Sequence, residues 1–282
     1  MAKTKKKTAS AQRGQIITFV SIVVVLMAIA VLILIKINKS SSPAATSSAV
    51  APSDVVAATT GVPDSAFSKI GYNSTLPKPS PIKESTSLTT NGLPEVLYMG
   101  ADYCPYCAAQ RWAIVSALSR FGTFSNLGAT SSSSTDSYPN TQTFSFHGAS
   151  YSSKYIGFVG VEMQTNIPSG GSYTPLDIPT TQESKLLSTW DIPPYTPTKG
   201  GIPFLDFGNK YVLGGSSYNP GLLQGLSMQT IAGSLSNTSS VPGKAILGSA
   251  NIITATICKI DNNQPSSVCS LSYIQQIEST LK

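Results

Sequence analysis

The chain has 282 residues and a formal net charge of +6, yet only 11% of its residues are charged. Seven of its 19 basic residues precede Ser40, where no acidic residue occurs, so the rest of the chain carries 12 basic against 13 acidic residues. The positive charge therefore belongs to the N-terminal segment, and the remainder has no excess of basic residues of the kind that nucleic-acid binding requires. The length allows one or two domains.

The N-terminal segment has the pattern of a membrane anchor. Residues 16–35 form an apolar run without a charge, preceded by five basic residues within positions 3–13. A helix of this length, at about 1.5 Å per residue, spans a hydrocarbon layer of roughly 30 Å. The basic residues predict a cytoplasmic tail at 1–15, a transmembrane helix at 16–35 and an extracytoplasmic remainder, that is, a single-pass protein of the cell membrane.

A cleavable signal peptide is the alternative for this segment. Its apolar region typically has about 7–15 residues, fewer than here, and a small-residue cleavage site follows closely. The best small-residue triplet, Ala49-Val50-Ala51, lies well downstream. The pattern favours an uncleaved anchor.

The next segment, residues 36–92, is rich in Ser, Thr, Pro and Ala. Such composition is typical of a flexible stalk. Apolar residues between Gly61 and Gly71 allow one short helix within it. We therefore expect the folded domain to occupy residues 93–282.

Strand-like and helix-like segments alternate from Leu93 onward. Residues 95–99 form a short apolar run that suits a buried strand, and residues 155–161 are apolar on both faces, as in a central strand. Between them, residues 104–121 have helical spacing with Gly122 as the expected stop. A further strand is predicted at 143–146.

A hairpin and three helices are predicted after Gly200. The strand-like runs 202–207 and 210–213 are joined by Gly208-Asn209, a turn signal for a β-hairpin. Apolar periodicity then predicts helices at 222–235, 245–257 and 270–281. The order of elements indicates an α/β fold.

The motif Cys104-Pro105-Tyr106-Cys107 lies where the first strand gives way to the first helix. Unpaired N–H groups at a helix N-terminus stabilise a thiolate, and a second cysteine one turn later can resolve a mixed disulfide. A static disulfide and half of a zinc site are the alternatives. The chain has one histidine, His147, and no second Cys-X-X-Cys pair, so we expect no metal and no cofactor.

The second cysteine pair, Cys258 and Cys269, flanks a turn-rich segment. We expect a structural disulfide worth roughly 3 kcal/mol from loop-closure entropy, with an electron relay to the first pair as the alternative. Near the motif, Arg111 is expected to be a solvated helix charge, with an ion pair to a nearby carboxylate as the alternative. Trp112 is expected to be a core residue rather than a platform for substrate. His147 is expected in a surface turn.

These features resemble the thioredoxin superfamily: a strand, the Cys104–Cys107 motif, a helix, and Ile202-Pro203 leading into a late hairpin. The resemblance implies a thioredoxin-like central mixed sheet with flanking helices and insertions. It also implies a cis peptide bond before Pro203, facing the motif, and a substrate groove formed by Pro105, Tyr106, Ile202 and Pro203.

Residues 98–112, with the sequence YMGADYCPYCAAQRW, resemble a prokaryotic family of membrane-anchored proteins described as a domain of unknown function (DUF929). Two departures from thioredoxin stand out. Tyr98 occupies the position of its buried aspartate, and the stretch from Cys107 to Pro203 is much longer, which implies inserted elements.

The motif predicts a membrane-anchored, extracytoplasmic thiol–disulfide oxidoreductase, an oxidase or exchange catalyst that acts through Cys104 and Cys107. Its partners would be exported cysteine-containing proteins and a membrane redox partner. The alternatives are a non-catalytic thioredoxin-like binding or chaperone module and a copper-handling protein, since soft thiolates suit Cu(I).

Overall fold

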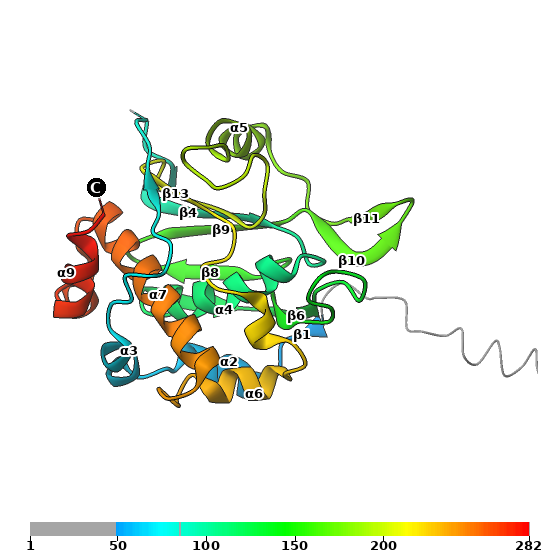
Figure 1. Ribbon diagram of the computed structural model, residues 1–282. Coiled ribbons are helices and arrows are strands. Elements are labelled where there is room, and N and C mark those ends of the chain that lie inside the picture. Colours follow the sequence, from blue (N-terminus) through cyan, green and yellow to red (C-terminus); the bar gives the residue numbers. More distant parts are fainter. Residues whose placement is uncertain (1–48, 85, 282) are drawn as a thin grey trace, which may run out of the picture. The chain divides into compact units, whose positions relative to one another are not determined.

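A six-stranded mixed sheet runs through the protein, with helices on both of its faces (Figure 1). The computed structural model describes residues 49–84 and 86–281. The predicted tail at 1–15 and transmembrane helix at 16–35 lie outside the described residues. The mixed α/β class that the sequence predicted is confirmed.

The helices are α2 (Ser53–Thr60), α3 (Asp64–Ile70), α4 (Pro105–Leu118), α5 (Thr181–Trp190), α6 (Met228–Ser234), α7 (Val241–Ile260), α8 (Ser266–Cys269) and α9 (Ser272–Glu278), with a 3-10 turn, η1, at Pro220–Leu223. The strands are β1 (Ala49–Val50), β2 (Ser80–Pro81), β3 (Thr89–Thr90), β4 (Leu93–Gly100), β5 (Gly122–Ser125), β6 (Gly128–Ser131), β7 (Gln142–Ser145), β8 (Ser150–Ser153), β9 (Gly157–Glu162), β10 (Gln164–Ser169), β11 (Ser172–Pro175), β12 (Phe204–Phe207) and β13 (Tyr211–Gly214).

Strand β4 is the centre of the sheet. It pairs with β12 on one side and with β9 and β3 on the other, and β13 and β2 follow beyond β12. Only the β4–β9 pairing is parallel; the other pairings of this sheet are antiparallel. The predicted strand at 95–99 and the predicted hairpin β12–β13 are both confirmed.

Both faces of β4 are buried, which explains its continuous apolar sequence. Val96 and Tyr98 face a large core that includes α4 and α7, whereas Leu97 and Met99 face a smaller core with Leu186 of α5. In Figure 1, α5 accordingly lies on the opposite side of the sheet from α4 and α7.

Helix α7 is, among the described residues, the one helix long and apolar enough to cross a membrane. Most of this helix is buried inside the protein, as expected of a helix in the core of a domain. Cys258 near its end forms a disulfide with Cys269 of α8, and the predicted pairing is thus confirmed.

The folded part of the chain begins well before Leu93, so the described portion of 36–92 is not the flexible stalk that was predicted, whereas the short helix allowed between Gly61 and Gly71 is present as α3. Strand β1 pairs with β6, and Val55 of α2 and Phe67 of α3 are buried in the large core. Asn251 of α7 donates from Nδ2 to the carbonyl oxygens of Phe67 and Gly71, at 3.0 and 2.9 Å. The elements are short, so a few buried apolar residues anchor a segment whose composition is otherwise polar.

Strand β9 is not the central strand predicted at 155–161. Within residues 49–84 and 86–281 it pairs with β4 alone, and its first four residues are partly exposed. Its apolar side chains pack on aromatic residues of the inserted strands instead: the rings of Phe146 and Phe158 lie 4.9 Å apart. A Cβ at Gly160 would come within 2.6 Å of Phe146 Cβ, so glycine allows this close approach.

Three predicted helices end or begin elsewhere. The helix predicted at 222–235 is interrupted, because Gly225 has φ +73° and α6 starts only after its N-cap, Ser227. Helix α4 ends at Leu118, and Gly122 begins β5 rather than stopping the helix. The helix predicted at 270–281 is α9, which is shorter than predicted and has Leu271 as its N-cap, and the short helix α8 precedes it.

Candidate functional site

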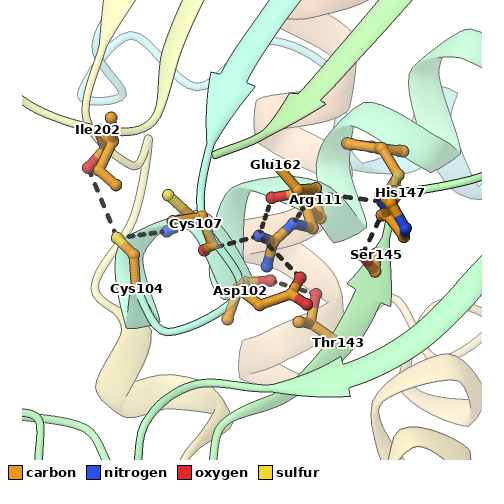
Figure 2. Close-up of polar contacts among 12 residues, drawn as sticks. Asp102, Cys104, Cys107, Arg111, Thr143, Ser145, His147, Glu162 and Ile202 are labelled. Atoms are coloured by element: carbon orange, nitrogen blue, oxygen red, sulfur yellow. Dashed lines mark hydrogen bonds and ion pairs between the residues drawn. The ribbon is translucent and has the colours of Figure 1, made fainter. Parts of the chain in front are cut away.

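The Cys-X-X-Cys motif lies at the N-terminus of α4, directly after the central strand. Cys104 is the N-cap residue, and its Sγ accepts a hydrogen bond from the backbone N–H of Cys107 at 3.2 Å. Pro105 occupies the first turn, where a missing N–H is harmless. Cys104 retains 5% of its surface, whereas Cys107 has none. Neither is in a disulfide in the structure, and of the two only Cys104, which lies beside Ile202 in Figure 2, keeps any exposed surface.

The two thiols differ in acidity. A hydrogen bond from the Cys107 thiol, helped by backbone N–H groups and by the charge of Arg111, lowers the pKa of Cys104 despite its burial. Burial, followed by the interaction with Cys104, raises the pKa of Cys107 well above its usual value. Cys104 is therefore the thiolate former of the pair, as a nucleophile requires.

The loop before β12 faces Cys104. The thiol of Cys104 donates to the carbonyl oxygen of Ile202 at 3.6 Å (Figure 2). The peptide bond between Ile202 and Pro203 is cis, the geometry that the resemblance implied. Pro105 and Pro203 are buried and Ile202 is partly exposed, whereas Tyr106 is 44% exposed and is the most accessible of the four predicted groove residues.

Tyrosines from two inserted segments stand beside the motif. The rings of Tyr106 and Tyr138 pack edge to face, with their centroids 6.0 Å apart. Tyr103, the residue before Cys104, stacks on Tyr173 of the β10–β11 hairpin at 4.1 Å. The insertions between Cys107 and Pro203 therefore border the site, a position that no pattern in the sequence predicted.

Arg111 is not the solvated charge that was expected. Its side chain is completely buried, and it forms a bidentate ion pair with Glu162 of β9: Nε to Oε1 at 2.8 Å and Nη2 to Oε2 at 2.5 Å. Nη2 also donates to the carbonyl oxygen of Ala101 at 2.8 Å and lies 3.7 Å from Asp102 Oδ1. Arg111 thus links α4, β9 and the loop that leads into Cys104.

The network continues toward the surface. The Glu162 N–H donates to Asp177 Oδ2 at 2.9 Å, and Asp177 Oδ1 lies 2.6 Å from Nδ1 of His147. His147 is partly exposed and lies in a turn with Gly148, as the sequence predicted, but it also has this acidic partner. In Figure 2 the charged residues extend from the cysteine pair to His147.

The resemblance to thioredoxin would place a buried aspartate at the position of Tyr98, and a tyrosine hydroxyl does not supply the carboxylate that such a residue would. Tyr98 is fully buried, its hydroxyl has no hydrogen-bond partner among the described residues, and burial raises its pKa well above the usual value. Its ring centroid lies 5.7 Å from the Arg111 guanidinium carbon. The buried carboxyls near the motif are instead Asp102 and Glu162, and burial raises the pKa of both.

One signal in the sequence pointed to Glu162. It ends the strand that runs parallel to β4, in register with Gly100. Because the carboxyl ends of parallel strands meet at one sheet edge, a polar residue there lies near the motif. Trp112, by contrast, is the predicted core residue, with no exposed surface.

No group of three or more His, Cys, Asp or Glu side chains that could hold a metal ion occurs in the described part of the chain. The thiols of Cys104 and Cys107 are the soft ligands of the site, and no third such ligand joins them there. The arrangement is suited to sulfur chemistry carried by the two cysteines.

A family model described as a domain of unknown function (DUF929) matches residues 82–176. The matched range, about a third of the chain, contains the cysteine motif, Arg111 and Glu162, and it ends before Ile202. The chain is similar to that family over this range. Comparison with curated proteins and with solved structures gives no match.

Proposed function

We propose that the protein is a membrane-anchored, extracytoplasmic thiol–disulfide oxidoreductase of thioredoxin-like fold that acts through Cys104 and Cys107. One observation carries the proposal: a slightly exposed, acidified thiol at a helix N-cap, backed by a fully buried thiol three residues later. A purely structural disulfide does not require its two cysteines to differ in acidity and solvent exposure.

The exchange proceeds in two steps. A substrate thiolate attacks Sγ of Cys104 in the oxidised pair, forming a mixed disulfide, and the Cys107 thiolate leaves and takes up a proton. A second substrate thiolate then attacks the substrate sulfur of the mixed disulfide and releases Cys104 as a thiolate. The substrate loses two electrons and the pair gains them; run in reverse, the same steps reduce or rearrange a substrate disulfide.

Leaving-group acidity favours the oxidising direction. A thiol with a lowered pKa leaves faster and stabilises the reduced form of the pair, which makes the disulfide a stronger oxidant. Cys104 has this property. The substrates are exported proteins with free cysteines, and continued oxidation requires re-oxidation of the pair by a membrane partner of the quinone-linked class.

The loop of Ile202 and Pro203 supports a substrate groove. The Ile202 carbonyl oxygen lies 3.6 Å from the Cys104 sulfur. A polypeptide that forms a mixed disulfide with Cys104 must therefore pass beside this loop, where a backbone acceptor is at hand. Tyr106, which is 44% exposed, borders the same opening.

A Cys107→Ser variant of the full chain tests the proposal. Without the resolving thiol, Cys104 should accumulate mixed disulfides with exported proteins, visible as bands that disappear on reduction. Cys104→Ser is the matched control and should trap far fewer, because the remaining thiol is fully buried.

Alkylation of the reduced protein provides the second measurement. Cys104 should react with iodoacetamide at a pH below that of an ordinary thiol, since its pKa is lowered. An unreactive Cys104 together with no trapped partners would leave a non-catalytic binding or chaperone module. Tight binding of Cu(I) by the reduced pair, lost in Cys107→Ser, would favour copper handling instead.

A further inference from the structure

Charged side chains are buried directly behind the cysteine pair. Arg111 and Glu162 have no exposed surface and Asp102 has 3%. Burial of an ion pair removes both charges from water, and the mutual attraction often does no more than compensate for that loss. A role in stability alone is therefore a weak explanation for these residues.

The guanidinium is anchored to the cysteine motif from two directions. Arg111 follows Cys107 by four residues on α4, so both side chains lie on one face of the helix. Its Nη2 donates to the carbonyl oxygen of Ala101, in the loop that leads to Cys104. Glu162 fixes the remaining freedom of the side chain through two hydrogen bonds.

We infer that Arg111, held in place by Glu162, is a positioning residue that sets the reduction potential of the Cys104–Cys107 pair by stabilising its reduced, thiolate-bearing form. This inference rests on the proposed function. Arg111 does not contact the substrate and takes no part in the disulfide exchange itself. Its positive charge stabilises a thiolate through the low-dielectric interior, where electrostatic interactions are strong.

The electrostatics of the site have the required signs. The charge of Arg111 lowers the pKa of both cysteines, whereas the charge of Glu162 raises that of Cys107. The other titratable groups that interact with Arg111 are Tyr98 of β4 and Asp102 of the following loop. Loss of the arginine and loss of the glutamate should therefore move the cysteine pair in opposite directions.

Two single variants of the full chain test this opposition. In Arg111→Met the reduced form loses its countercharge, and we expect the equilibrium with a glutathione redox buffer to shift about tenfold toward the disulfide, a potential about 30 mV more negative. In Glu162→Gln the arginine remains uncompensated, and we expect a shift of similar size in the other direction. Cys104 alkylation should move to higher pH in the first variant and to lower pH in the second.

Two further variants complete the test: one is a control for the loss of a positive charge, and the other replaces the two pair variants if these do not fold. Arg120→Met removes an equal charge just beyond the far end of α4, where Arg120 pairs with Asp64 at 3.0 Å, and should leave the potential unchanged. Asp102→Asn removes a negative charge while the Arg111–Glu162 pair stays intact. It should shift the potential in the same direction as Glu162→Gln, and it decides the matter if the pair variants do not fold.

A purely structural role gives a different pattern. Both pair variants would then melt at lower temperature, as breaking a buried ion pair predicts, while their potentials stay equal to that of the wild type or shift in the same direction. Either result overturns the inference, as does an unchanged potential in Asp102→Asn if the pair variants do not fold. Proteins that keep Arg111 separate the two proposals. Reactive Cys104 in the wild type and partners trapped by Cys107→Ser would support the proposed function even if the Arg111 variants show no effect on the potential.

Discussion

The Cys258–Cys269 disulfide offers a test between a structural and a relay role. Both cysteines are buried, with 0% and 1% of their surface exposed, and the bond closes a loop with a sequence separation of 11. In the chain-entropy model, closing such a loop stabilises the folded state by about 3 kcal/mol. That is a large share of a total stability of roughly 5–15 kcal/mol.

The perturbation is the double variant Cys258→Ala/Cys269→Ala, since alanine leaves no buried polar group. With a urea dependence of roughly 2–3 kcal/mol per M, the loss of about 3 kcal/mol lowers the urea midpoint by about 1 M. The fluorescence of Trp112, which has no exposed surface, reports unfolding of the full chain in mild detergent.

The same variant should retain the rate at which the oxidised Cys104–Cys107 pair oxidises a dithiol peptide. An unchanged urea midpoint combined with a large loss of turnover would refute the structural interpretation and support a relay. Cys107→Ser is the control in the same assay, because it should lose turnover while the Cys258–Cys269 disulfide stays intact.

Two further predictions concern buried polar groups. Burial raises the pKa of Asp206 to about 7, so the folded state binds a proton that the unfolded state releases, and stability should fall as pH rises from about 4 to 7 and then level off. Asp206→Asn keeps the acceptor for the Asn209 N–H and should be about 2–4 kcal/mol more stable than the wild type at pH 8 but similar at pH 4 in urea unfolding. Equal stability of the two proteins at both pH values would contradict this. Asn251→Ala leaves the carbonyl oxygens of Phe67 and Gly71 without their donor, so we expect a loss of about 2–4 kcal/mol and faster proteolysis within residues 49–84. Unchanged proteolysis would mean that this segment is held independently of α7.

Local patterns in the sequence determined several parts of this protein. The hairpin β12–β13 follows from a Gly208-Asn209 turn between two apolar runs, and the disulfide follows from two cysteines around one turn. The start of α4 at Cys104 follows from a strand, a proline in the first turn and a run of helix-favouring residues. In each case the interacting residues are near neighbours in the chain.

Composition misled where short elements are fixed by distant contacts. Residues 49–92 look like a polar linker, yet α3 is held by Asn251, which lies 184 positions beyond Phe67. Likewise, β9 has the apolar sequence of a central strand, but an inserted aromatic cluster covers it at the sheet edge. Periodicity reports that a residue is buried and does not report which element buries it.

The sequence by itself therefore determined the cysteine pair of the motif, its place at a helix N-terminus and the α/β class. Only the tertiary structure decided their surroundings. Arg111 has the sequence context of a surface helix charge and becomes a buried cation because Glu162, 51 positions away, ends the strand parallel to β4. The acidity of a thiol depends on charges that are near in space, and pairing between distant strands places those charges.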